Sequence, residues 1–165
     1  MDLQVNNRVA PPWDDAEALE IVARHRQMPG ATLPILHALQ ERFGYIGRAA
    51  IPMVAEALNL SQAEIHGVVA FYDDFREQPP GRHTLRMCRA EACQSMGCNT
   101  LVEQAEKRLG VGLGATTADG KVTLEAAYCL GNCACAPAAM LDGELIGRLD
   151  SARLDRLLDR LESAS

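Results

Sequence analysis

The stretch HTLRMCRAEAC, residues 83–93, decides the fold, because it joins a strand-like run directly to a pair of cysteines. The same arrangement returns in KVTLEAAYCLGNC, residues 121–133, where a second strand-like run leads into a second pair. The first pair is spaced C-x4-C and the second C-x3-C. Both loops are rich in small residues, so backbone from two distant segments can converge and present four thiolates to one inorganic centre.

The four candidate metal ligands are Cys88, Cys93, Cys129 and Cys133. Soft anionic sulfur is what iron in a cluster requires, and four thiolates give each of two irons two protein ligands beside the bridging sulfides. A four-cysteine zinc site also uses closely spaced pairs, so the spacing alone fits zinc as well as iron. Cys98 could be a third ligand, but we expect it to open the following helix. Cys135 could replace Cys133, but we expect it to be a small buried residue.

Composition limits the class of protein. A chain of 165 residues with 48% hydrophobic residues can cover a modest core. No apolar run reaches the roughly 18 residues of a membrane helix, and the first twenty residues have neither a basic start nor an apolar run. We therefore expect a soluble, cytoplasmic protein without a membrane span. In a reducing cytosol, clustered cysteines are more often metal ligands than disulfides.

Charge argues against a nucleic-acid partner. The formal net charge is −6, whereas a polynucleotide binder needs a basic face to neutralise phosphates. Aromatic residues make up only 4% of the chain, so a base-stacking platform is not expected. The partner we expect is another protein.

The chain divides near REQPPGRH, residues 76–83, where two prolines and a glycine interrupt the patterning. We expect an α+β protein with a helical bundle over residues 1–80 and an α/β domain with a small mixed sheet over residues 81–165. In the first half, Asp14 and Thr32 are the expected caps of the first two helices, and Ser61 with Glu64 forms a capping box for the fourth. The apolar stripe of that fourth helix is predicted to be Ile65, Val68, Val69 and Tyr72.

The second half reads as β-α-β-β-β-α. Its predicted elements are a strand at 83–88, a helix at 99–110, a strand at 121–129, a hairpin over 138–149 around Asp142-Gly143, and a closing helix capped by Ser151. Both cysteine pairs then follow strands, at what we expect to be one end of the sheet.

The sequence around the cysteines resembles the thioredoxin-like 2Fe-2S ferredoxins. The resemblance is carried by CRAEACQSMG and YCLGNCACAPAAM, and by LPILHALQERFGYI, AIPMVAEALNLS and AEIHGVVAFYDDF in the helical half. Members are the small peripheral subunits of respiratory NADH:quinone oxidoreductase, of NAD-reducing hydrogenases and of NAD-dependent molybdenum formate dehydrogenases. The resemblance implies a thioredoxin-like second domain whose one 2Fe-2S cluster is ligated by Cys88, Cys93, Cys129 and Cys133. It leaves Cys98 and Cys135 outside the ligand set.

Within that family, CRAEACQSMG, TTADGKVTLE and CLGNCACAP look most like the gamma subunit of soluble NAD-dependent formate dehydrogenase. The resemblance implies a non-catalytic electron-transfer subunit that docks on a flavin- and NAD-binding subunit, in a complex with a molybdenum-containing catalytic subunit. FMN, NAD and the molybdenum cofactor are expected on those partners, and no catalytic residue on this chain. The alternatives are the equivalent subunit of NADH:quinone oxidoreductase or of an NAD-reducing hydrogenase, and a structural zinc interaction module.

The helical half is expected to be a docking module, because a small cluster domain does not need four extra helices to bind its cluster. Its segment HGVVAFYDDF supplies the candidate partner contacts His66, Phe71 and Tyr72. Helical spacing equally allows Val68, Val69 and Tyr72 to be core residues instead.

Overall fold

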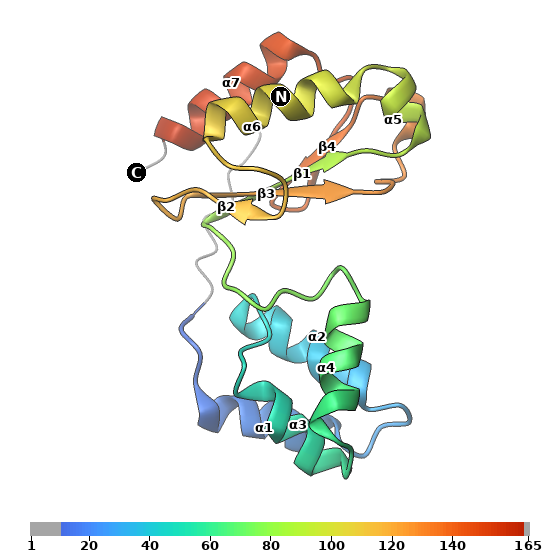
Figure 1. Cartoon of the computed structure of the whole chain (residues 1–165), viewed down its shortest axis with the longest axis vertical. Coiled ribbons are helices and arrows are strands. Elements are labelled where there is room, and N and C mark those ends of the chain that lie inside the picture. The colour runs from blue at the N-terminus through green and yellow to red at the C-terminus, as the bar shows by residue number, and fades with distance from the viewer. Residues whose placement is uncertain (1–10, 164–165) are drawn as a thin grey trace. The chain divides into compact units, whose positions relative to one another are not determined.

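The computed structural model describes residues 11–163, and the chain splits into two compact units between Pro79 and Pro80. We call them the helical unit and the sheet unit; both are drawn in Figure 1. Among the described residues, the first contains helices and no strand, and the second contains a mixed five-stranded sheet with helices. The predicted α+β class is therefore confirmed. In the part of the chain that the structure describes, no helix is long and apolar enough to cross a membrane.

The helical unit consists of α1 (Asp15–His25), α2 (Thr32–Phe43), α3 (Ala50–Leu58) and α4 (Gln62–Phe71). Each helix buries one apolar face in a common core. The fully buried larger side chains of that core are Ile35, Leu36, Leu39, Phe43, Ile46, Val54 and Ile65. This unit therefore has a hydrophobic core of its own.

Most predicted helix ends in this unit are confirmed. The Asp14 carboxylate accepts the Glu17 N–H at 2.8 Å, and both hydrogen bonds of the Ser61–Glu64 capping box are present. The predicted cap at Thr32 is wrong, because Thr32 is already the first helical residue and no side chain caps α2. Its neighbour Ala31 holds the cap position with helical backbone angles, so the helix begins without a side-chain acceptor.

The C-terminal end of α4 also differs from the prediction. The helix ends at Phe71, so Tyr72 lies past its apolar stripe in extended backbone and is 42% exposed. Phe75 is buried in its place, with its ring centroid 6.0 Å from that of Tyr72. The helical period predicts one residue too many because an aromatic residue follows the helix at helical spacing.

The sheet unit contains β1 (His83–Cys88), β2 (Ala115–Thr116), β3 (Val122–Ala127), β4 (Ala139–Leu141) and β5 (Glu144–Ile146) in the order β2-β3-β1-β4-β5. Strands β1 and β3 are parallel and all other pairs are antiparallel. The short strand β2 was not predicted. A parallel pair needs a crossover connection, which here includes α5 (Glu91–Ser95) and α6 (Cys98–Leu109).

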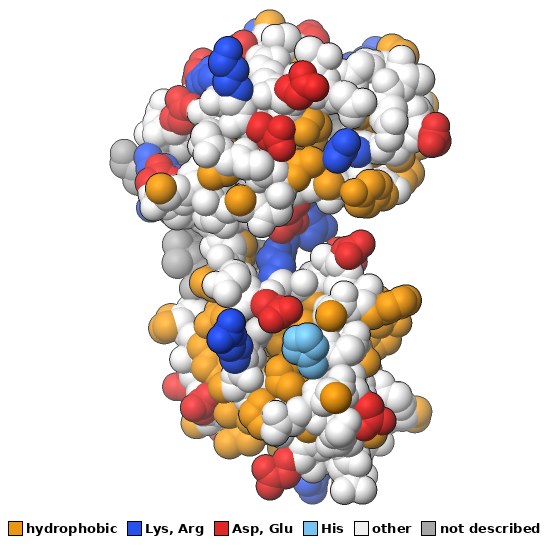
Figure 2. Space-filling model, viewed as in Figure 1, with side chains coloured by type: hydrophobic (Ala, Val, Ile, Leu, Met, Phe, Trp, Pro, Cys, Tyr) orange, Lys and Arg blue, Asp and Glu red, His pale blue; other side chains and the backbone are white. Residues whose placement is uncertain are grey.

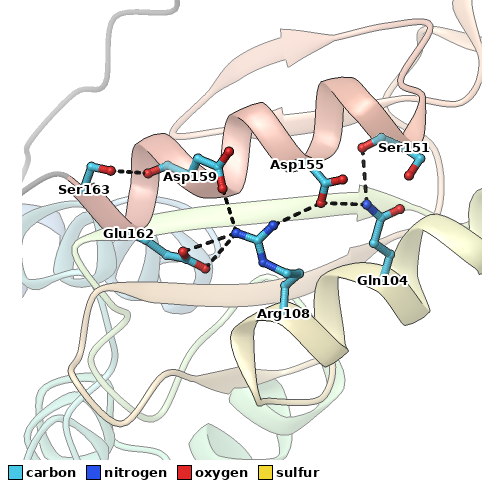
Figure 3. A network of polar contacts seen from close by, with 7 residues as sticks. All are labelled: Gln104, Arg108, Ser151, Asp155, Asp159, Glu162 and Ser163. Carbon is cyan, nitrogen blue, oxygen red and sulfur yellow. Dashed lines mark hydrogen bonds and ion pairs between the residues drawn. The ribbon is translucent and has the colours of Figure 1, made fainter.

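Helix α7 (Ser151–Ser163) closes the unit and lies with α6 over the same face of the sheet (Figure 1). Its buried residues Leu154, Leu157, Leu158 and Leu161 follow helical periodicity. The predicted cap at Ser151 is wrong: the Asp150 carboxylate accepts the Arg153 N–H at 2.7 Å, and Ser151 is the first helical residue. Arg108 of α6 reaches Asp155, Asp159 and Glu162 of α7 at 2.8 to 3.2 Å (Figure 3).

The predicted hairpin between β4 and β5 is confirmed. Asp142 and Gly143 both have positive φ, at 50° and 92°, as a two-residue type I′ turn requires. The Asp142 carboxylate also accepts the Thr84 N–H at 2.8 Å and contacts Nδ1 of the buried His83 at 2.8 Å. These contacts fasten the hairpin turn to the first residues of β1.

Candidate metal centre

Both cysteine loops leave the same end of the sheet. Strands β1 and β3 run parallel, and their register places Cys88, the last residue of β1, opposite Ala127, the last residue of β3. Cys129 follows Ala127 by two residues. Since the carboxyl ends of parallel neighbours meet at one edge, the two loops lie next to each other although they are far apart in the sequence.

The first pair is buried. Cys88 and Cys93 are 2% and 1% exposed, and they pack with Cys98 and Ala138 in one small apolar cluster. Cys93 lies in α5, a single short turn of helix directly after β1 that the sequence did not predict. This turn brings the chain back, so that the Cys88 and Cys93 thiols lie close enough to shift each other's pKa.

The electrostatics of this pair are set by burial and by backbone N–H groups. Burial raises the pKa of the Cys88 thiol, but hydrogen bonds from Cys93 and from the backbone N–H groups of Ala90, Leu130 and Cys129 bring that pKa below its ordinary value. Burial and the hydrogen bond to Cys88 raise the pKa of Cys93 to about 11. The backbone groups that lower the pKa of Cys88 come from both loops, so this sulfur lies where the two loops meet.

The second pair is exposed, and loop backbone positions it. The sulfurs of Cys129 and Cys133 are 3.8 Å apart, and the Gly131 N–H points at the Cys129 sulfur from 3.4 Å. Cys129 has a φ of 129°, an uncommon value for a residue with a side chain. The hydrogen bond with Cys129 and the charge of Cys129 raise the pKa of Cys133.

Gly147, the residue after β5, packs closely against the second cysteine loop. A Cβ atom at this position would lie 2.6 Å from Asn132 Nδ2 and 2.7 Å from the Cys135 Cβ, closer than real Cβ contacts. The next residue, Arg148, donates its N–H to the Cys135 carbonyl at 2.6 Å. The hairpin therefore holds the loop by close backbone approach, a constraint that has no signal in the sequence.

The cysteines are arranged as two pairs, and this fits a cluster with two metal ions. Within residues 11–163, no three His, Cys, Asp or Glu side chains converge on a point that could hold one ion. A structural zinc ion needs four ligands around a single centre, whereas a 2Fe-2S cluster takes two thiolates at each of two irons. Two pairs of cysteines are therefore compatible with the two irons of a 2Fe-2S cluster.

The two remaining cysteines lie beside this arrangement. Cys98 is the first residue of α6, as predicted, and is 2% exposed. Burial and the charge of Cys88 raise its pKa. Cys135 is half-buried in the short 3-10 turn η1 (Cys133–Cys135). Because it lies in the same turn as the candidate ligand Cys133, its position does not exclude it as a ligand.

Arg89 is a residue of this site that sequence reasoning missed. It directly follows Cys88, and its Nε atom is buried without a hydrogen-bond partner among the described residues. The signal was present in the motif CRAEAC, where a cation stands next to the first candidate ligand.

The candidate partner contacts belong to the helical unit. Phe71 is 78% exposed, His66 is exposed on the same helix, and the Phe71 and Tyr72 rings meet edge to face with centroids 5.1 Å apart. Figure 2 shows hydrophobic side chains at the surface of this unit, among scattered charged ones. Exposed aromatic side chains are common in protein interfaces, so their exposure is compatible with the predicted role.

Comparison with known proteins identifies the family. The family model for the thioredoxin-like [2Fe-2S] ferredoxin matches residues 18–162. The chain belongs to this family. Its members carry a 2Fe-2S cluster, so the predicted thioredoxin-like fold and the predicted cofactor, one 2Fe-2S cluster, are both confirmed.

Relatives of this chain are components of NAD-linked oxidoreductases. It is 36% identical over 146 residues to a subunit of the NADH-quinone oxidoreductase of Pseudomonas aeruginosa, covering 88% of each chain. The subunit of the same name in Escherichia coli is 33% identical over 147 residues, covering 88% of this chain and 89% of that one. A crystal structure of an NAD+-reducing [NiFe]-hydrogenase matches with a TM-score of 0.69 and 27% identity, covering 85% of this chain but only 24% of the hydrogenase chain.

Proposed function

We propose that this chain holds its 2Fe-2S cluster through Cys88, Cys93, Cys129 and Cys133 and passes single electrons to or from a flavin- and NAD-binding partner subunit. The observation that carries the proposal is the unequal exposure of the two pairs. Cys88 and Cys93 are at most 2% exposed, while Cys129 and Cys133 reach the surface. One edge of the centre is therefore shielded from water, and the other is open to a partner.

The cluster, when bound, supplies a centre that accepts and returns one electron. The chain's own residues hold and insulate it. Backbone N–H groups of Ala90, Leu130 and Cys129 donate to the Cys88 sulfur, and the Gly131 N–H donates to the Cys129 sulfur. Such donors stabilise negative charge on sulfur. No acid, base or nucleophile on this chain takes part, because no bond to a substrate forms or breaks.

We further propose the helical unit as the docking module, with His66, Phe71 and Tyr72 in the interface. Its support is the exposure of two adjacent aromatic rings at the end of α4. Phe71→Ala should weaken binding to the flavin subunit by about tenfold or more. Leu19→Ala is the matched control, because Leu19 is 53% exposed on α1 of the same unit. Equal affinities of the two variants would exclude Phe71 from the interface.

Two kinds of enzyme complex are candidates to contain this subunit. The relatives favour the first, an NADH-quinone oxidoreductase or an NAD-reducing hydrogenase. The second candidate is the gamma subunit of an NAD-dependent molybdenum formate dehydrogenase in the cytoplasm. It is supported by the resemblance of CRAEACQSMG, TTADGKVTLE and CLGNCACAP.

The deciding experiment purifies the chain anaerobically, alone and with its native partners. Equal iron and acid-labile sulfide at about two per chain, with one paramagnetic signal after reduction, is the expected result. Zinc without sulfide would overturn the proposal. Assays of the native complex with formate, with hydrogen and with NADH plus a quinone then assign it, because only one of the three activities should co-purify with the chain.

A further inference from the structure

Arg89 has a buried polar atom that no described residue satisfies. Its side chain is half-buried, and within residues 11–163 its Nε finds no hydrogen-bond partner. Arg86, three residues earlier in β1, instead pairs with Glu125 at 2.9 Å. Burying a cationic donor without a partner is unfavourable, so such groups mark positions where an anionic ligand binds.

The backbone fixes Arg89 beside the cysteines. Its N–H donates to the Ala127 carbonyl at 2.7 Å, and its own carbonyl accepts the Gln94 side-chain amide at 2.7 Å. The residue is thereby tied to the end of β3 on one side and to α5 on the other.

We propose that Arg89 is an electrostatic partner of the cluster and raises its reduction potential. This inference rests on the ligand set proposed above. Two ferric ions, two sulfides and four thiolates carry about two negative charges in total, and one added electron raises this to about three. The Arg89 guanidinium belongs to the residue after Cys88 and has a buried Nε; it is attracted more strongly to the reduced state, so it favours the uptake of that electron.

The test is the midpoint potential of the holoprotein, measured by potentiometric titration followed with electron paramagnetic resonance. Arg89→Gln should shift the reduction equilibrium about tenfold toward the oxidised state, which corresponds to about 59 mV for one electron. The shift should be the same from pH 6 to pH 9, because an arginine stays protonated throughout. Arg89→Lys, which keeps the charge, should recover at least half of it.

Arg160→Gln is the matched control, because Arg160 is exposed in the last turn of α7 and its loss changes the net charge equally. Its midpoint should equal that of the wild type. Equal midpoint potentials of wild type and Arg89→Gln, at equal iron and sulfide content, would overturn the role of Arg89 but not the proposed function. A wild type without iron and sulfide would instead overturn the proposed function.

If Arg89→Gln fails to load a cluster, the midpoint potential of Arg89→Lys tests the proposal instead. A loaded Arg89→Lys protein with a potential near that of the wild type supports the electrostatic role, since only the charge is shared. An Arg89→Lys protein that also fails to load would overturn it, because packing of the arginine and not its charge is then what matters.

Discussion

The two cysteine loops that supply the proposed ligands are built in opposite ways. The first takes its cysteines from regular elements, the end of β1 and the helix α5, and buries both. The second takes them from irregular backbone, with a positive φ at Cys129 and Gly147 behind the loop, and leaves both cysteines exposed. Secondary structure thus places one pair, and close backbone packing places the other.

This difference teaches that the four proposed ligands, although of the same chemical type, need not hold their positions equally firmly. A ligand at the end of a central strand keeps its place as long as the sheet is paired. A ligand in an irregular loop depends on a few contacts, here the Gly131 N–H and the surface around Gly147. We expect the second loop to be the part that loosens first when the cluster is absent.

Ligand substitutions should have the largest effect and test this difference directly. Cys88→Ser should abolish the cluster, because its sulfur is where donors from both loops meet. Cys133→Ser should lose it too unless Cys135 takes over, which the irregular loop allows. Visible absorption and iron content of Cys133→Ser and of the Cys133→Ser/Cys135→Ser double variant measure this. A double variant that still holds a normal cluster would exclude Cys133 as a ligand.

Removal of the cluster should destabilise the sheet unit and leave the stability of the helical unit almost unchanged. Chelation should lower the melting temperature of the sheet unit by about 10 °C or more, because binding free energy becomes folding free energy. The helical unit, with its own core, should change little. Hydrogen exchange followed by mass spectrometry distinguishes the units. Equal protection of residues 121–135 in apo and holo protein would contradict the expected loosening.

Gly147→Ala should damage the second loop selectively. The new Cβ would overlap Asn132 and Cys135, and relief of such overpacking costs about 1–3 kcal/mol. Cluster content after reconstitution and the free energy of unfolding measure the effect. Gly112→Ala is the control, since its Cβ would meet only Glu106 Oε1 at 3.7 Å. Similar losses in both variants would show that Gly147 has no special role.

In the apoprotein, the exposed cysteine pair should react with an alkylating reagent faster than the buried Cys93. At pH 8, iodoacetamide should modify Cys129 and Cys133 at least about tenfold faster than Cys93, which is buried with a pKa of about 11.

The raised pKa of Cys93 also makes the stability of the apoprotein depend on pH. Its contribution to the free energy of unfolding is fully present below the ordinary thiol pKa near 9 and is lost as pH rises toward about 11. Peptide mass spectrometry and unfolding at several pH values check both statements.

The smallest effect is expected at Cys98. Cys98→Ser should leave the visible and paramagnetic spectra unchanged, because Cys98 opens α6 outside the two pairs. Loss of the cluster in this variant would overturn the proposed ligand set. Any change in stability should stay near about 1 kcal/mol, the scale of one buried polar replacement.

The elements with clear periodicity could be predicted from the sequence, and those set by single contacts could not. The strands before the cysteines, the hairpin at Asp142-Gly143 and the Ser61–Glu64 capping box follow from local rules that the structure obeys. The caps at Thr32 and Ser151 were wrong because a hydroxyl next to a helix start gives no information on whether it is the first residue inside or the last outside.

Features that depend on tertiary contacts had no local signal. Helix α5 is only five residues long, too short for a periodic pattern. The need for glycine at 147 arises from a loop that precedes it by more than ten residues, and the missing partner of Arg89 is defined only by its surroundings. Chemistry was readable from the cysteines themselves, but the support around them was not.

The parallel pairing of β1 with β3 has a consequence for synthesis. Since the register joins Cys88 to Ala127, a growing chain that has emerged only as far as α6 contains the first candidate pair and Cys98, but neither Cys129 nor Cys133. With the ligand set proposed above, the cluster site is complete only after residue 133 has been synthesised and β1 has paired with β3, so we expect cluster content to report that the sheet has formed.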